Sequence, residues 1–358
     1  MPIPLDGLEV GQGSTSPGSP ARKMLNVGRR VLPLVFTLLI FFFIFHRIPF
    51  IRFLEALSAA DYPRFLLLML PNSLFYFAWD TLVLAYLMRW FHGPMRYRDL
   101  LPVRAASYVI ALMNTQLARG ALALYLTRQL RAPFFQIAST VIFLTLLEMT
   151  HLATWATAGM LSFPTQVPKG LFWVPAGFGV FWLIFLLYWR LDFAPWRVVS
   201  SAVIGFSPSF RDRLRVRQWS ILRTFEQAPL KRYVQVILLR APMFAVSLVI
   251  HFVAVRTFGF EIPLGQLLAF LPIIFMLAAL PITVAHLGTT QAAWIFFFGD
   301  YAAPSELLAY SLASHLAFML ARGLLGLVFL PRAYRDLFGT LQARQVGAAG
   351  HPLPQTLR

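Results

Sequence analysis

The chain has 358 residues, of which 58% are hydrophobic and 13% are charged, and it carries a formal net charge of +17 with no cysteine. Its apolar residues form long runs rather than the spaced pattern of a soluble core, which excludes a soluble globular enzyme and indicates a polytopic helical membrane protein. Lys and Arg in cytoplasmic loops explain the positive charge better than nucleic-acid binding, because no basic patch alternates with exposed stacking aromatics. Disulfides and thiolate metal sites are excluded.

Residues 1–27 are rich in Gly, Ser and Pro and carry Asp6 and Glu9. They lack the basic start and early apolar core of a cleavable signal peptide, so we expect a disordered cytoplasmic tail. A basic cluster precedes the first apolar run and places the N-terminus in the cytoplasm: Arg22, Lys23, Arg29 and Arg30.

Six apolar segments are long enough, with their flanks, to cross a bilayer. They are residues 31–45, 65–88, 133–161, 171–189, 233–255 and 304–330. Two further apolar stretches, 99–131 and 264–298, are broken at 114–120 and between Pro281 and Gly288. Irregular backbone at membrane depth needs surrounding protein or a water-filled cavity. The sequence therefore predicts an all-α polytopic membrane protein with six full spans plus two re-entrant broken-helix hairpins.

This topology keeps most Lys and Arg on one side of the membrane, whereas a full crossing in place of either hairpin would put a basic block outside. It divides the chain into the tail 1–27, a transmembrane domain 28–331 and a cytoplasmic tail 332–358. We expect an integral protein of the bacterial cytoplasmic (inner) membrane with both termini in the cytoplasm.

The basic cytoplasmic linker 190–232 contains one predicted amphipathic helix. After a start signal at 207–209, one helical face holds Phe210, Leu214, Ile221 and Phe225. Such a helix lies either on the inner leaflet or packed on the bundle as a solvated linker, and the pattern alone favours neither.

The order span, span, hairpin, span occurs twice, in halves of about 28–161 and 170–331. Three crossings per half is an odd number, so we predict an inverted repeat. Pro71 and Pro133 are separated by the same distance along the chain as Pro242 and Pro304. The same offset aligns Asp80 with His251 and His151 with Arg322.

Polar side chains recur inside the predicted spans at helical spacing. Three sets each share a helix face: Asn72, Tyr76 and Asp80; Thr145, Glu148 and His151; Ser311, His315 and Arg322. A charge in mid-membrane costs about 2.5 to 3.5 kcal/mol, so each should face a cavity or a partner. Two interpretations stay open: an ion pair that clamps helices, such as Glu148 or Asp80 with Arg322 or Arg240, or contact with cargo or a proton.

Several chemistries lack their motifs. Glu148 and His151 form one E-x-x-H pattern, but carboxylate metal sites in bundles need two such motifs plus further carboxylates. No Gly-x-Ser-x-Gly turn, Walker A or dinucleotide glycine pattern occurs. We therefore predict no catalytic residue, no metal and no cofactor.

Both hairpins contain a glycine where we expect a new helix to begin, Gly120 and Gly288. Free N–H groups at such a helix start favour an anion, and Arg119 adds a full charge, so a lipid phosphate is the expected ligand. The alternative is that these glycines only allow tight turns and close packing.

The two hairpins carry matches to a known pair of signatures. These matches are Asn114, Arg119, Gly120 and Glu148 in the first half, and Pro281, Gly288 and Gln291 in the second. They resemble the lysylphosphatidylglycerol synthase transmembrane-region family, also called flippase-like integral membrane proteins, over residues 31–330. The chain departs from that pattern where Ala121 and Gln291 replace Glu, Met149 replaces Arg, and Ala285 and His286 replace a glycine pair. The resemblance implies the membrane part of such synthases without the aminoacyl-transferase domain.

We therefore expect a lipid or polyprenyl-lipid transporter, not an enzyme, that moves an anionic-headgroup lipid between leaflets, with membrane lipids as its partners. The expected substrate-binding residues are Asp80, Asn114, Arg119, Gly120, Glu148, His151, Pro281, His286, Gly288, Gln291, His315 and Arg322. One alternative is an intramembrane transferase with a lipid-linked donor, using Asp61, Asp300 or Glu306. Another is a membrane partner of a glycosyltransferase or lipid-modifying enzyme, docked through 190–232.

Overall fold

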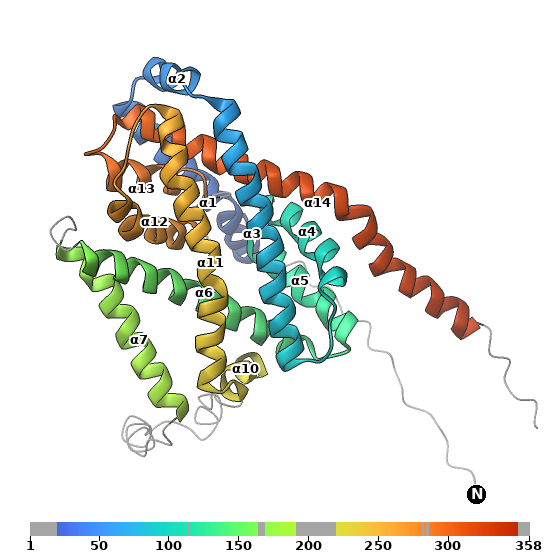
Figure 1. Cartoon of the computed structure of the whole chain (residues 1–358). Helices are drawn as coiled ribbons and strands as arrows, with labels where there is room; N and C mark the ends of the chain where they lie inside the picture. Colours follow the sequence, from blue (N-terminus) through green and yellow to red (C-terminus); the bar gives the residue numbers. More distant parts are fainter. Residues whose placement is uncertain are drawn as a thin grey trace, which may run out of the picture.

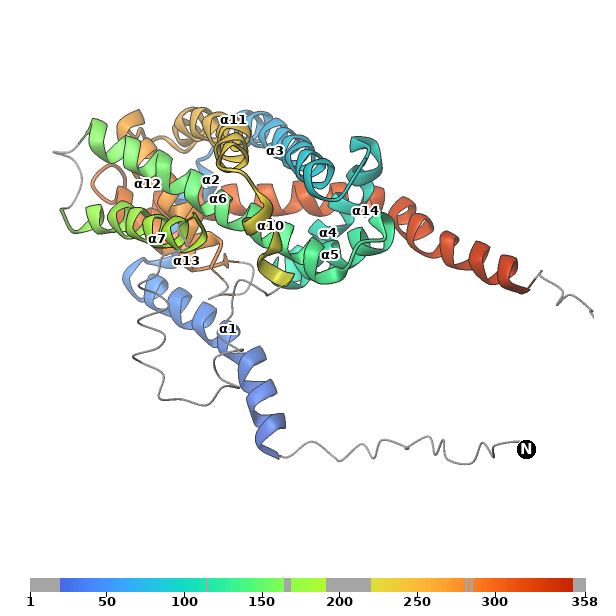
Figure 2. The ribbon, with the colours of Figure 1, turned by 90° about the horizontal axis from the view of Figure 1, so that it is seen from below.

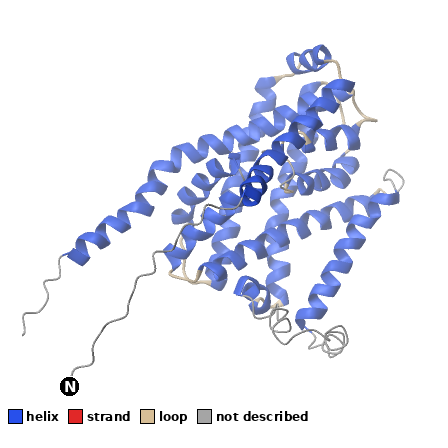
Figure 3. Cartoon of the chain, turned by 180° about the vertical axis from the view of Figure 1, so that it is seen from behind, coloured by secondary structure: helices blue, strands red, loops and turns tan. Residues whose placement is uncertain are grey.

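The computed structural model describes residues 20–113, 115–163, 169–190, 220–280, 283 and 286–349. Every regular element within these ranges is helical, and Figure 3 shows no strand among them. The prediction of an all-α protein is confirmed, and the long apolar helices indicate an integral membrane protein.

Four helices are long and apolar enough to cross a membrane. They are α3 (Tyr62–Phe91), α6 (Phe134–Ser162), α11 (Leu230–Ala254) and α14 (Pro304–Ala349), and they contain four of the six predicted spans. The spanning part of α14 ends at Arg332, and the helix continues beyond the bundle (Figure 1). Many large apolar side chains on these helices are exposed, as lipid-facing residues would be.

The other two predicted spans differ from these four. Helix α1 (Pro20–Arg47) turns by 90° into the short α2 (Phe50–Ser58). Only the two together are long and apolar enough to count as one possible crossing. Helix α7 (Trp173–Arg190) follows a 3₁₀ turn (Lys169–Phe172), and its apolar part is shorter than a full span. Helix length therefore supports four or five crossings directly.

Both broken stretches are present as pairs of short helices. The first pair is α4 (Tyr97–Met113) and α5 (Thr115–Leu130), and the second is α12 (Leu264–Ala278) and α13 (Thr289–Phe298). Gly288, at φ 91°, directly precedes α13 as expected. Gly120 does not begin a helix: α5 starts at Thr115, and Gly120 lies exposed in its interior, where a helix tolerates glycine at modest cost.

The helix pairs pack reciprocally between the two halves. The first arm of each pair lies on the last long helix of the other half, α4 on α14 and α12 on α6. The second arms lie on the following helix of their own half, α5 on α6 and α13 on α14, while α3 and α11 run side by side (Figures 1 and 2). Gly159 permits the contact of α6 with α12, because a Cβ there would lie 2.6 Å from the Ala269 backbone nitrogen.

The described end of the basic linker packs on the bundle. It forms a 3₁₀ turn (Ser220–Leu222) and the short helix α10 (Arg223–Gln227), which contacts α6. The Phe225 side chain is buried, with its ring centroid 5.1 Å from that of Phe143. Phe225 therefore packs on the bundle rather than on the leaflet, Ile221 is half-buried, and Phe210 and Leu214 lie outside the described residues.

Candidate functional site

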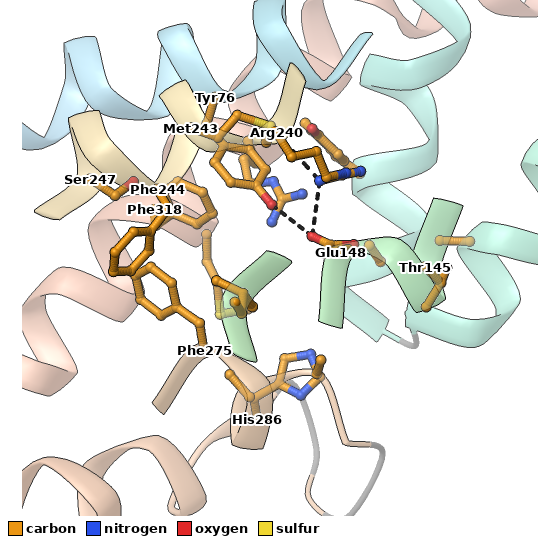
Figure 4. Close-up of a pocket in the computed structure, with 18 of the residues that line it drawn as sticks. Tyr76, Thr145, Glu148, Arg240, Met243, Phe244, Ser247, Phe275, His286 and Phe318 are labelled. Carbon is orange, nitrogen blue, oxygen red and sulfur yellow. Dashed lines mark hydrogen bonds and ion pairs between the residues drawn. The ribbon is translucent and has the colours of Figure 1, made fainter. Parts of the chain in front are cut away.

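A cavity of about 310 Å³ lies where the two helix pairs meet the four long helices. Side chains from α3, α4, α5, α6, α11, α12, α13 and α14 contribute to its wall, so both broken stretches reach it (Figure 4). Five charged side chains line it: Arg104, Arg119, Arg240, Arg322 and Glu148. Charges surrounded by long apolar helices need partners or a ligand, which makes this cavity the candidate site.

Asp80 on α3 is the centre of a buried ion-pair network behind the wall. Its carboxylate accepts a 2.7 Å hydrogen bond from Arg104 Nε and a 3.0 Å bond from Arg240 Nη2. The Tyr108 hydroxyl donates to the same carboxylate at 3.4 Å. These bonds tie α4 and α11 to α3. Asp80 is only 1% exposed, so its carboxylate is not available to a ligand in this arrangement.

Glu148 on α6 shares Arg240 with Asp80. Arg240 Nη1 lies 3.2 Å from Glu148 Oε1, and the Tyr76 hydroxyl donates to the same oxygen at 3.2 Å (Figure 4). Of the ion pairs considered for these two acids, the structure contains those with Arg240, and the described residues contain none with Arg322. Arg240 is 2% exposed and spans both carboxylates, so one guanidinium connects α11 to α3 and α6.

Arg322 on α14 has aromatic neighbours instead of a carboxylate. Its guanidinium carbon lies 3.8 Å from the Tyr108 ring centroid and 4.9 Å from that of Phe318. Its Nε has no hydrogen-bond partner in the described part of the chain. No carboxylate of the described residues forms an ion pair with Arg322 or Arg119. The cavity therefore has a positive excess, because both nearby carboxylates are already paired with Arg104 and Arg240.

A neutral polar region adjoins this charged region. The Ser247 hydroxyl on α11 donates to Asn72 Oδ1 on α3 at 3.3 Å, and His251 Nδ1 lies 2.6 Å from the Tyr310 hydroxyl. His151 on α6 also lines the cavity, with its ring edge-to-face against Phe244. Aromatic residues complete this part of the wall: Phe244, Phe275 and Trp294.

The structure brings half of the expected site residues together in the wall. These are Arg119, Glu148, His151, His286, His315 and Arg322. Asp80 lies directly behind them in its ion-pair network. Asn114 and Pro281 lie outside the described residues.

Three expected site residues have structural positions outside the wall. Gln291 is buried and its Oε1 accepts a 2.7 Å hydrogen bond from the Gly288 backbone N–H, which caps the start of α13. Gly288 also faces α1, since a Cβ there would lie 3.2 Å from Ile40. Gly120 is exposed in the interior of α5. Gly288 therefore allows a tight turn and close packing against α1, which is the alternative to anion binding at this glycine.

Sequence reasoning missed Arg104 and Tyr108. Both lie on α4 and are spaced one helical turn apart, so they share a face. Arg104 is one of the basic residues of the predicted hairpin 99–131. Its position inside an otherwise apolar arm of the first broken stretch is the signal that could have identified it.

A polar cluster at the other end of α3 lies beyond the span. His92 follows the last residue of α3, and its Nε2 lies 2.7 Å from the Thr140 hydroxyl, which is 2.8 Å from the Thr224 hydroxyl. Burial lowers the pKa of His92 from its ordinary value of 6.5. This cluster joins α3, α6 and α10 at one end of the bundle.

Comparison with known protein families, with curated proteins and with solved structures finds no match for this chain.

Proposed function

We propose that the protein is a lipid transporter that moves an anionic-headgroup lipid, a phospholipid or a polyprenyl-lipid, between membrane leaflets. The observation that carries this proposal is the positive excess of the cavity, in which Arg119 and Arg322 have no carboxylate partner among the described residues. Both side chains are half-buried among apolar helices, where a charge without a counter-ion is costly, and an anionic ligand would offset that cost.

The chemistry of the wall suits a lipid phosphate. Guanidinium groups present several N–H donors in a planar arrangement that matches phosphate oxygens. A volume of about 310 Å³ accommodates a headgroup but not two acyl chains, which would remain in the bilayer.

The proposal includes a topology of six crossings and two re-entrant hairpins in an inverted repeat, in the bacterial inner membrane with both termini cytoplasmic. The reciprocal packing of α4 on α14 and α12 on α6 supports the repeat, because an inverted pair of halves would exchange these contacts. The α1 and α2 pair and α7 would supply the two additional crossings.

The test is leaflet exchange in vesicles that contain the purified protein. We expect faster exchange of fluorescent phosphatidylglycerol and polyprenyl phosphate than of phosphatidylcholine, measured by quenching from outside. Arg322→Gln should slow exchange of the anionic lipids about tenfold, corresponding to the loss of one charge-assisted bond.

Arg332→Gln is the matched control, because Arg332 lies on the same helix α14 but is exposed at the end of the span. It should exchange lipids at the wild-type rate. Anionic lipids that cross no faster than in empty vesicles would contradict the proposal.

The transferase alternative gains no support from its candidate acids. The Asp61 side chain accepts from the Arg64 backbone N–H at 3.2 Å and caps α3. Glu306 accepts from the Ala303 backbone N–H at 3.0 Å at the start of α14. Two of the three acids therefore serve as helix caps, and transport remains the function that the geometry supports best. Docking of a partner enzyme through 190–232 falls largely outside the described residues.

A further inference from the structure

The two ends of the helix bundle, marked by α2 and by α10 in Figure 1, carry their exposed charges differently. At the α2 end, three exposed arginines each pair with an acid close by in the sequence: Arg52 with Glu55, Arg64 with Asp61, and Arg256 with Glu261. Most of the positive charge at this end is therefore balanced within the chain.

The α10 end is basic, and its charges are not balanced. The contacts of His92, Thr140 and Thr224 bring together the end of α3, the start of α6 and α10. Seven exposed basic side chains lie in the segments that meet here, and none forms an ion pair with a described residue: Arg89, Arg96, Arg98, Arg128, Arg131, Arg223 and Lys231. The acids of the same described segments are Asp99 and Glu226. We call these seven side chains the basic end.

Arg131 has a backbone conformation that does not favour its own side chain. It follows the last residue of α5 at φ 51°, in the left-handed region where glycine or asparagine is usual after a helix. Among the described residues only one other non-glycine has a positive φ, His286, and it lines the cavity. The exposed Arg131 side chain makes no ion pair within the described chain that would offset this strain. Local strain is often kept where a side chain serves a function, so arginine here points to an anion outside the fold.

Exposed apolar side chains border the basic end and indicate the kind of anion. Phe134 and Phe135 begin α6 just after Arg131, and Leu230 begins α11 beside Lys231. A soluble anion would leave these apolar groups in water. A bilayer places anionic headgroups and acyl chains side by side at the ends of its spanning helices, so it satisfies both kinds of side chain.

We propose that the basic end binds the anionic headgroups of the leaflet that adjoins it, with Arg131 as one of the contacts. This lipid-binding surface is separate from the cavity, because none of its seven basic side chains lines the cavity wall. It concentrates anionic lipid on one side of the bundle, and its affinity decreases as salt screens the charges. The surface does not depend on lipid transport.

Titration of the purified full chain in detergent with phosphatidylglycerol, followed by native mass spectrometry, tests this surface. Arg131→Asn removes the charge and places a residue that tolerates left-handed backbone at this position. We expect about fivefold weaker affinity, the equivalent of one basic residue at an anionic lipid surface, without a fall in unfolding temperature. A lower unfolding temperature with unchanged affinity would show a structural role only and overturn the proposal.

A second variant leaves the strained backbone untouched. Arg96→Gln combined with Arg98→Gln should weaken affinity for phosphatidylglycerol about 25-fold, because two charges are lost. Arg52→Gln is the matched control: Arg52 is also exposed, but it pairs with Glu55 at the α2 end, so wild-type affinity is expected. Equal losses for the double variant and for the control would contradict a surface confined to the basic end.

Further arms identify the ligand. Phosphatidylcholine should bind the wild type and Arg131→Asn equally, since it has no net charge. Inorganic phosphate should displace no more phosphatidylglycerol than sodium chloride does at the same ionic strength. Greater displacement by phosphate would identify a site for the free anion and overturn the proposal.

The Arg322→Gln background separates this surface from the cavity. The loss of affinity caused by Arg131→Asn should be the same in that background, and its disappearance would mean that the two arginines serve one site. If the protein retains phosphatidylglycerol through the basic end but exchanges no lipid between leaflets, the transport function is contradicted and this surface is supported.

Discussion

The two broken stretches surround one cavity but supply it with opposite chemistry. The first contributes charge and a phenol through Arg104 and Tyr108 on α4 and Arg119 on α5. The second contributes Phe275, His286 and Trp294, with no charged side chain in the wall. The offset of the predicted repeat that aligns Asp80 with His251 also aligns Arg104 with Phe275, and the first pair forms an ion pair whereas the second forms an aromatic contact. Similar helix arrangements can thus be given different functions by a few side chains.

The stability of the protein should fall more when a charged group is lost beside the first broken stretch than when a group is changed beside the second. Asp80→Asn leaves Arg104 and Arg240 buried with one carboxylate fewer, and breaking a buried ion pair in this way costs about 3 to 5 kcal/mol. We expect the largest fall in thermal unfolding temperature in detergent for this variant.

Asp61→Asn provides the matched control, because Asp61 also lies at α3 but pairs with an exposed Arg64. Exposed ion pairs contribute about 0 to 1 kcal/mol, so a small shift is expected. Equal shifts for the two variants would mean that the Asp80 network does not hold the charged region together.

The stability of the second broken stretch, 264–298, should depend on close packing against α6 rather than on charge. Gly159→Ala places a methyl group against the backbone of Ala269 and must separate α6 from α12, at a cost of about 1 to 3 kcal/mol. Thermal unfolding measures this loss.

Gly120→Ala is its counterpart in the first broken stretch. A Cβ there meets no atom within 4 Å, and replacing a helix-interior glycine by alanine stabilises by up to about 1 kcal/mol. The two Gly→Ala variants should therefore shift the unfolding temperature in opposite directions. A loss at Gly120 as large as that at Gly159 would show that the two regions do not differ in packing.

The smallest expected effect concerns the polar cluster of His92, Thr140 and Thr224 at one end of the bundle. Because burial lowers its pKa in the folded protein below the ordinary 6.5, the unfolded chain binds the proton first as the pH falls. His92 therefore contributes full stability above pH 6.5 and progressively less below it. His92→Gln should flatten the dependence of the unfolding temperature on pH between 7 and 5 relative to the wild type, and an unchanged slope would exclude this role.

Much of this architecture follows from local signals in the sequence. Long apolar runs predicted α3, α6, α11 and α14, because a segment of that length and composition is most stable across a bilayer. Spacing by one helical turn placed Asn72 and Tyr76 on the cavity side of α3, with Asp80 directly behind. The break before Gly288 was located correctly because a positive φ strongly favours glycine there.

The remaining features depend on contacts between distant residues. Arg104 pairs with Asp80 only because α4 packs beside α3, and no local pattern in the sequence specifies that contact. Gly120 misled the assignment of the helix start because glycine is also tolerated inside a helix, and only the backbone hydrogen-bond pattern distinguishes the two cases. The role of Gln291 as a cap, by contrast, is local, because it stands three residues after Gly288, and this capping spacing is the signal that could have identified it.

The packing of α4 on α14 and of α12 on α6 affects how the chain can fold. Because α4 rests on α14 and α12 rests on α6, neither half contains all the helices that cover its own broken stretch. We therefore expect that a half produced alone would leave the apolar surface of one arm uncovered and would fold only with its complementary fragment.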